Sequence, residues 1–148
     1  ERFMAPGDMP SRIADFCRET KQPVPESSGE FLRCCLESLA LLYRDTLRRI
    51  EELTGSAIKR LHIVGGGSQN QLLNQFTANA CGIPVMAGPV EATALGNIIV
   101  QAIVAGDIDS LKNGRAIIGA SYDLEEFQPE SADEWLDVVK RFEGLRGA

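Results

Sequence analysis

The sequence predicts an α/β domain with more helix than strand. Two short apolar segments, at residues 57–64 and 84–87, have the composition of strands. Apolar residues recur at three- and four-residue steps in other segments, as in amphipathic helices. A glycine-rich turn joins the first strand to the helix after it. The 148 residues are enough for one domain and few for a two-domain enzyme.

Two helices are expected before the first strand. Ser11 is expected to cap a short helix that runs to Thr20, and two prolines then indicate a linker. Ser27 and Glu30 have the spacing of a capping box, which marks the start of a long helix. This helix is expected to end at Gly55, because glycine readily adopts the left-handed conformation that closes a helix.

The helix after the glycine-rich turn has clear start and stop signals. Ser68 and Gln71 have capping-box spacing, so the helix is expected to begin there. Gly82 is expected to end it, and Pro84 prevents its continuation. Its inner face is expected to consist of Leu72, Leu73, Phe76 and Ala80.

The last third of the chain is less regular. A helix over residues 92–105 is apolar around most of its circumference, which predicts a buried helix. Gly96 in its middle predicts close helix packing. Residues 107–148 are expected to form an irregular segment, up to about residue 130, and a terminal helix after Ser131. The inward-facing residues of that last helix are expected to be Trp135, Val138, Val139 and Phe142.

The composition argues against several classes of protein. A net charge of -6 argues against nucleic-acid binding, which needs a basic face. No apolar run approaches the roughly 20 residues of a membrane span, and the first residues show no secretory signal. We therefore expect a cytoplasmic protein without nucleic-acid or membrane partners. The four cysteines form no CxxC pair, so we expect reduced thiols and no zinc site.

The candidate binding site is the sequence Gly-Gly-Gly-Ser-Gln-Asn at residues 65–70. Glycines let a backbone approach a ligand closely, and a helix start offers free N–H groups with a partial positive charge. No charged side chain occurs in residues 61–90, and the helix after the glycines carries neutral amides instead. Amides can hydrogen-bond a neutral base or sugar, or they can pack against another domain. The amides are Gln69, Asn70, Gln71, Asn74, Gln75 and Asn79.

Two common nucleotide-binding motifs are not matched by these glycines. A P-loop requires a lysine after the glycines, and none is present. A dinucleotide-binding turn requires a third glycine, where this sequence has Asn70, and an acidic residue about 20 positions later. Glu91 lies too far along and is expected to complement the dipole of the next helix. Glycines that only shape a tight turn remain an alternative.

Two segments resemble motifs of the FGGY family of carbohydrate kinases. Residues 61–70 (LHIVGGGSQN) resemble the adenosine motif of the family, and residues 91–97 (EATALGN) resemble its helix start after the second strand. The resemblance is greatest to members that phosphorylate L-rhamnulose, and the tail after Gly106 matches loosely. Other segments that carry it lie at residues 17–22, 29–34, 38–44, 72–75, 80–83 and 87–92.

This resemblance implies an actin-like ATPase fold with two ribonuclease-H-like domains. Residues 1–148 would be the C-terminal part of the second domain, on its nucleotide-binding side, with a short parallel sheet. The implied reaction transfers the γ-phosphate of ATP to L-rhamnulose, giving L-rhamnulose 1-phosphate, with Mg²⁺. The family's DxGT-type phosphate loop, its catalytic Asp and its sugar-binding residues have no match in this chain. We therefore expect the chain alone to be inactive, with the sugar bound outside it.

The resemblance also implies roles for individual residues. Gly66 resembles the glycine whose backbone lies against the nucleotide, and Gly65 and Gly67 are expected to shape the turn. Asn70 resembles the position that reaches the adenine. Ser68 is expected to be a helix cap. No catalytic or metal-binding residue is assigned.

Three further expectations remain open. A disulfide between Cys17 and Cys34 is one, because the resemblance allows their two helices to pack together. Another FGGY sugar kinase, of fuculose or xylulose type, and a non-catalytic nucleotide-binding or interaction module are alternative functions. Exposed cleft and inter-domain surfaces also predict self-association of this chain.

Overall fold

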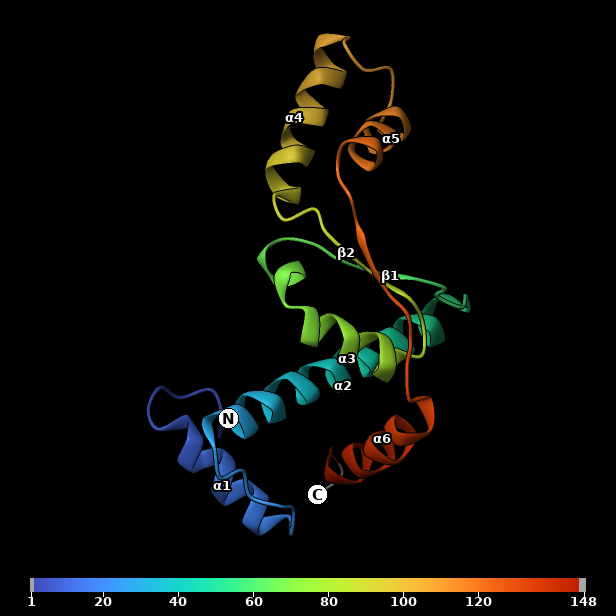
Figure 1. The fold of residues 1–148 in the computed structure, drawn as a ribbon. Coiled ribbons are helices and arrows are strands. Elements are labelled where there is room, and N and C mark those ends of the chain that lie inside the picture. Colours follow the sequence, from blue (N-terminus) through green and yellow to red (C-terminus); the bar gives the residue numbers. More distant parts are fainter. Residues whose placement is uncertain (1, 147–148) are drawn as a thin grey trace.

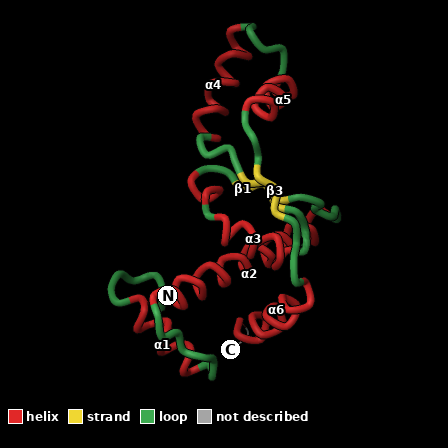
Figure 2. Tube along the Cα trace, viewed as in Figure 1, coloured by secondary structure: helices red, strands yellow, loops and turns green. Residues whose placement is uncertain are grey.

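The computed structural model describes residues 2–146, in which six α-helices surround three short strands. Figure 1 and Figure 2 show α4 and α5 at one end of the molecule, the sheet in the middle and α1 at the opposite end. No helix in this described part is long and apolar enough to cross a membrane. The elements are α1 (Met9–Glu19), α2 (Ser28–Thr54), β1 (Leu61–Ile63), the 3₁₀ helix η1 (Gly66–Gln69), α3 (Gln71–Cys81), β2 (Val85–Ala87), α4 (Ala92–Ala105), α5 (Leu111–Ser121), β3 (Glu125–Phe127) and α6 (Ala132–Arg146).

The sheet is mixed, with the order β1-β2-β3. β1 and β2 are parallel, with Leu61 opposite Val85, as expected for two strands joined by the crossover helix α3. β3 pairs antiparallel with β2 and places Phe127 opposite Val85. The expected parallel pair is therefore present, but the sheet also contains a third strand that the sequence did not predict. The first strand is also shorter than residues 57–64.

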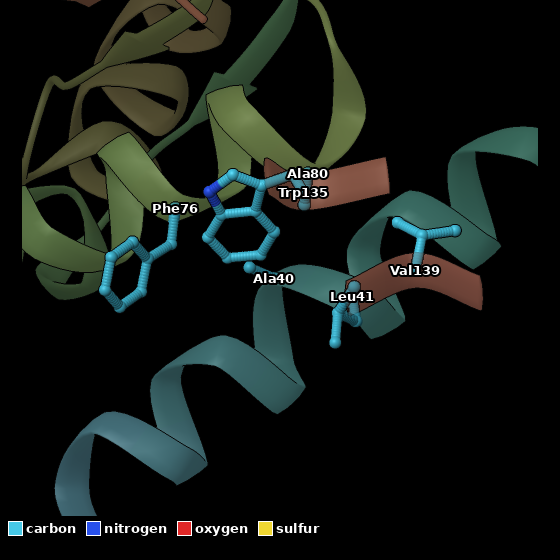
Figure 3. Close-up of a cluster of buried hydrophobic side chains, with 6 residues drawn as sticks. All are labelled: Ala40, Leu41, Phe76, Ala80, Trp135 and Val139. Carbon is cyan, nitrogen blue, oxygen red and sulfur yellow. The ribbon is translucent and has the colours of Figure 1, made fainter. Parts of the chain in front are cut away.

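The main core lies where α2, α3 and α6 meet. Figure 3 shows the indole of Trp135 close to Ala40 of α2 and Phe76 of α3. The two aromatic rings are 5.4 Å apart between centroids. Ala40 is fully buried, and its small side chain lets α2 and α3 approach closely. The expected inward face of the last helix is confirmed, because Trp135 and Val139 are buried and Val138 and Phe142 pack against them.

A second core lies between α3 and the sheet. Ala78 of α3 packs against Val85, Ala87 and Phe127. Two amide side chains of α3 form hydrogen bonds with the segment that follows β3. Gln75 Nε2 donates to the carbonyl of Gln128 at 2.8 Å, and the N–H of Glu130 donates to Asn79 Oδ1 at 2.8 Å. Two of the amides in the charge-free region therefore hold the fold together.

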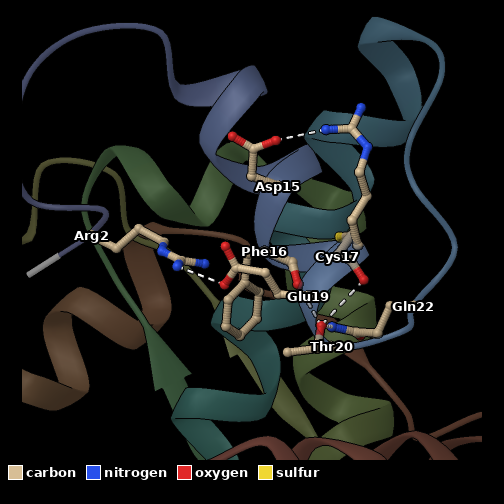
Figure 4. A network of polar contacts seen from close by, with 8 residues as sticks. Arg2, Asp15, Phe16, Cys17, Glu19, Thr20 and Gln22 are labelled. Carbon is tan, nitrogen blue, oxygen red and sulfur yellow. Dashed lines mark hydrogen bonds and ion pairs between the residues drawn. The ribbon is translucent and has the colours of Figure 1, made fainter.

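Local hydrogen bonds define the ends of the first two helices. The expected cap of α1 at Ser11 is wrong, because Asp8 caps this helix and accepts hydrogen bonds from the N–H and Oγ of Ser11. These bonds lower the pKa of Asp8. Figure 4 shows the ion pair between Arg2 and Glu19, which ties the chain before α1 to the end of the helix. For α2, the expected ends are confirmed at Ser27 and Gly55.

The expectation that residues 107–130 are irregular is wrong. They contain α5 and β3, and Ser110 caps α5 by accepting from the N–H of Asn113. Two glycines in this helix, Gly114 and Gly119, hide its signal because glycine has a low helix propensity. The close packing of Gly114 against Ile99 explains one of them, since an added Cβ would lie 2.3 Å from Ile99 Cγ2.

The expectation that the helix over residues 92–105 is buried is also wrong. In α4 only Ile99 is buried, whereas Ile98, Val100 and Val104 are 61%, 54% and 84% exposed. The apolar residues around α4 indicate that each of its faces needs a packing partner, and α5 covers only one face. Close packing at Gly96 is wrong too, because a Cβ there would meet no atom within 4 Å.

Substitutions at the two glycines of α5 test the packing of α4 on α5. Gly114→Ala overpacks the contact with Ile99, so we expect amide hydrogen exchange in α5 to become about tenfold faster or more. Gly119→Ala is the matched control, because an added Cβ there meets no atom within 4 Å. It should slow exchange, since alanine favours a helix by about 0.5–1 kcal/mol over glycine. Equal effects of the two substitutions would contradict this packing.

Candidate nucleotide site

The glycine turn lies at the carboxyl ends of the two parallel strands. The N–H of Gly65 donates to the carbonyl of Pro89 at 3.1 Å, and the N–H of Gly88 donates to the carbonyl of Ile63 at 2.8 Å. These two bonds join the segments that leave β1 and β2. Ligands of open α/β sheets bind at this edge, outside the carboxyl ends of parallel strands.

Gly65 differs from Gly66 and Gly67 in its backbone conformation. Gly65 has φ 78° and ψ -167°, a conformation that is essentially restricted to glycine. Gly66 and Gly67 have no positive φ and belong to η1. A Cβ at either position would meet no atom within 4 Å. The conformation of Gly65 therefore explains why glycine shapes the turn there. Gly66 and Gly67 adopt ordinary conformations, and the space beside them is open.

Ser68 closes the turn and does not cap α3, so the expected role of Ser68 is wrong. Its N–H and its Oγ both bond to the carbonyl of Gly65, at 3.0 and 2.7 Å. The side chain is buried as a result. The chain passes through η1 before α3 begins, which moves the start of the helix two residues beyond the position that the capping-box spacing predicts.

Asn70 is the cap of α3. Its Oδ1 accepts from the N–H of Leu73 at 3.0 Å. The cap uses the side-chain oxygen and leaves the Nδ2 donors for another partner. Capping and contact with a base are therefore compatible at this residue, because they use different atoms of the same amide.

A cavity of about 300 Å³ opens beside the turn. One wall is formed by the first turn of α3 and the segment after β2. The other wall comes from residues 122–125, where the chain passes from α5 into β3. Sequence reasoning missed this second wall, because it lies in the segment predicted to be irregular. The lining residues are Ser68, Gln69, Gln71, Ala87, Gly88, Pro89, Val90, Tyr122, Asp123 and Glu125.

The turn itself suits a nucleotide better than a metal ion. Magnesium is held by carboxylates and phosphates, and residues 61–90 have no charged side chain. In the described part of the chain, no group of three or more His, Cys, Asp or Glu side chains could hold a metal ion. Open backbone at Gly66 and Gly67 fits a neutral ligand surface such as a nucleoside.

Three residues of the two matched segments lie outside the turn. Glu91 occupies the cap position of α4 but makes no capping bond with its side chain. Thr93 is exposed on α4, and His62 is exposed on β1. His62 lines an apolar groove of about 270 Å³ between α2 and β1, at the free edge of the described sheet.

The cysteines are free thiols in this structure. Cys17 and Cys81 are buried, Cys34 is partly buried and Cys35 is exposed. Burial raises the pKa of the Cys34 thiol, and the nearby Cys17 raises it further. The two thiols are therefore neighbours, but they are not joined in the disulfide that the resemblance allows.

Comparison with known proteins identifies the family. The sequence model of the "FGGY family of carbohydrate kinases, C-terminal domain" matches residues 1–105. This match covers more than half of the chain, so the chain belongs to the FGGY family of carbohydrate kinases.

Individual relatives agree with this assignment. The chain is 48% identical over 133 residues to a rhamnulokinase of Bacteroides thetaiotaomicron, which covers 90% of this chain and 27% of the relative. The crystal structure of a xylulose kinase from Rhodospirillum rubrum has the same fold, with a TM-score of 0.62 and 23% identity. That match covers 84% of this chain and 25% of the kinase. The chain thus spans about a quarter of the length of these relatives.

The buried thiol of Cys81 in α3 predicts a pH dependence of stability. Burial raises its pKa to about 11, so the folded chain keeps this proton at a pH where the unfolded chain loses it. The free energy of unfolding should fall by about 2 kcal/mol as the pH rises from about 9 to 11. Urea denaturation of wild type and Cys81→Ala across this range measures the effect. Equal pH slopes in the two proteins would contradict it.

Proposed function

We propose that this chain is the nucleotide-holding part of an ATP-dependent sugar kinase. The observation that carries the proposal is the open backbone at Gly66 and Gly67. Each glycine costs a helical turn about 1 kcal/mol relative to alanine. Neither residue has a positive φ, and neither is crowded by a neighbour. The absent side chains thus leave space for a molecule outside the chain, at the sheet edge where ligands bind.

Different residues of the turn would have different roles in binding a nucleoside. The backbone of Gly66 lies against the nucleotide, and Gly65 sets the direction of the chain. Asn70 reaches the adenine with its Nδ2 donors while its Oδ1 caps α3. ATP would supply the phosphoryl group, and Mg²⁺ would offset the charge of the transfer. The carboxylates for Mg²⁺ and the sugar-binding residues belong to parts of the kinase outside this segment.

The proposed sugar is L-rhamnulose, with L-rhamnulose 1-phosphate as the product. The identity of 48% to a rhamnulokinase, over 90% of this chain, supports this choice. A kinase for xylulose or fuculose is the second candidate, and the xylulose kinase of similar fold is less similar in sequence. We place the kinase in the cytoplasm, where ATP is available.

A single methyl group at Gly66 tests the nucleotide site. Gly66→Ala fits the free chain, because its Cβ would meet no atom within 4 Å. We expect the fold to be as stable as wild type or more so, and the affinity for ADP to fall about tenfold or more through overpacking. Amide chemical shifts of Gly66 and Asn70 during an ADP titration provide the measurement.

The matched control is Gly96→Ala in α4. This helical glycine has equally open space but lies away from the turn, so its ADP affinity should equal that of wild type. An unchanged ADP affinity in Gly66→Ala would count against the site. Equal shift changes with NAD and none with ADP would favour a dinucleotide-binding fold instead.

The chain alone should not phosphorylate a sugar. Its turn offers neutral groups, and neither the phosphate loop of the family nor its catalytic Asp is matched in the sequence. A coupled assay with ATP, Mg²⁺ and L-rhamnulose should therefore show no ADP release above background. A full-length kinase of the family in the same assay serves as the positive control. A clear sugar-dependent rate from the 148 residues would overturn this expectation.

The chain should also associate with a second copy of itself through α4. This helix has no charged residue to oppose association, and it exposes Ile98, Val100 and Val104. Sedimentation velocity should detect oligomers that Ile98→Lys with Val104→Lys reduces. Leu136→Lys, at a side chain 52% exposed on α6, is the control. Wild type that stays monomeric at high concentration would contradict this expectation.

A further inference from the structure

The most unusual polar side chain of the described fold is Asn74. It lies in α3 among the neutral amides of the charge-free region, yet it has no exposed surface. Its Nδ2 donates to the carbonyl of Ser68 at 2.8 Å. Its Oδ1 is buried and has no hydrogen-bond partner among the described residues. The side-chain nitrogen of Asn74 therefore has a hydrogen-bond partner, whereas its side-chain oxygen is buried without one among the described residues.

An apolar residue would suit the interior better if packing were the only requirement. A buried acceptor without a partner is unfavourable enough to offset the gain of one ordinary hydrogen bond. Thr77, one turn later, is just as buried, but its hydroxyl is satisfied by the carbonyl of Leu73 at 2.7 Å. The amide at Asn74 therefore needs a reason other than packing, and the bond to Ser68 is the one hydrogen bond that its side chain makes among the described residues.

That bond is one of two that tie residues 65–68 of the glycine turn to other elements of the fold. At its first residue, the turn is attached to the end of β2 through the N–H of Gly65 and the carbonyl of Pro89. At Ser68 it is attached to the interior of α3 through Asn74. The open glycines, Gly66 and Gly67, lie between the two attachments. Their orientation relative to α3 thus depends on the amide of Asn74.

We propose that Asn74 is a positioning residue for nucleotide binding. Its hydrogen bond to the carbonyl of Ser68 holds the backbone of Gly66 and Gly67 in the orientation that accepts the nucleotide. This bond acts together with the one from the N–H of Asn70 to the carbonyl of Gly67, at 3.2 Å, which sets this backbone relative to the start of α3. Asn74 itself is buried beneath the turn and does not touch the ligand. The inference rests on the proposed function of the turn.

The test compares Asn74→Leu with Thr77→Val in the 148-residue chain. Both substitutions remove a buried hydrogen bond from α3 and keep the number and branching of the side-chain heavy atoms, so both should lower the melting temperature. Only Asn74→Leu releases the turn. We expect the amides of Ser68 and Asn70, which bond within the turn, to exchange about tenfold faster in Asn74→Leu than in Thr77→Val. The ADP affinity should fall about tenfold in Asn74→Leu and stay within twofold of wild type in Thr77→Val.

Each outcome decides one part of the inference. Equal turn exchange and equal ADP affinity in the two variants would show that Asn74 only supports the fold, and would overturn the proposal. Faster exchange with unchanged ADP affinity would also overturn it, because the position of the turn would not matter to the ligand. Wild type that binds no ADP would refute the proposed function instead, while the exchange comparison would still decide whether Asn74 holds the turn.

Discussion

The hydrogen bond from Asn74 Nδ2 to the carbonyl of Ser68 connects the candidate site to the core of the molecule. Helix α3 lies at the centre of the fold, because it packs against α2, α6 and the sheet. A turn that is hydrogen-bonded to this helix is held in place by the same packing. The second attachment, from Gly65 to Pro89, ties the turn to the strand pair. The proposed binding at the open glycines would therefore take place on a preorganised backbone, which lowers the entropy lost when a ligand binds.

The neutral amides around the turn serve the fold more than the sequence suggests. Asn70 caps α3, Asn74 holds the turn, and Gln75 and Asn79 fasten the segment after β3. A charged side chain in place of Asn74, Gln75 or Asn79 would be buried or half-buried at high cost, so amides provide polar contacts there without that penalty. Of this group, Asn70 combines a structural bond with free donors at the site.

Local signals in the sequence predicted the elements whose ends are made by local contacts. The caps of α2 at Ser27 and Gly55 and the end of α4 at Gly106 are of this kind. The third strand and the exposure of α4 could not be predicted, because pairing and burial depend on residues distant in sequence. The role of Asn74 was missed for the same reason: periodicity treats an amide as a surface residue, and its partner lies in an unexpected 3₁₀ turn.

We propose that the turn over residues 65–70 holds the adenosine end of ATP. A crystal structure of a kinase containing this segment, with a non-hydrolysable ATP analogue, would test this proposal. We expect the nucleoside to lie against the backbone of Gly66, with Nδ2 of Asn70 within hydrogen-bond distance of the adenine. The bond from Asn74 to Ser68 should remain intact beneath it. A nucleoside bound away from this turn, with Gly66 and Gly67 facing solvent, would contradict the account.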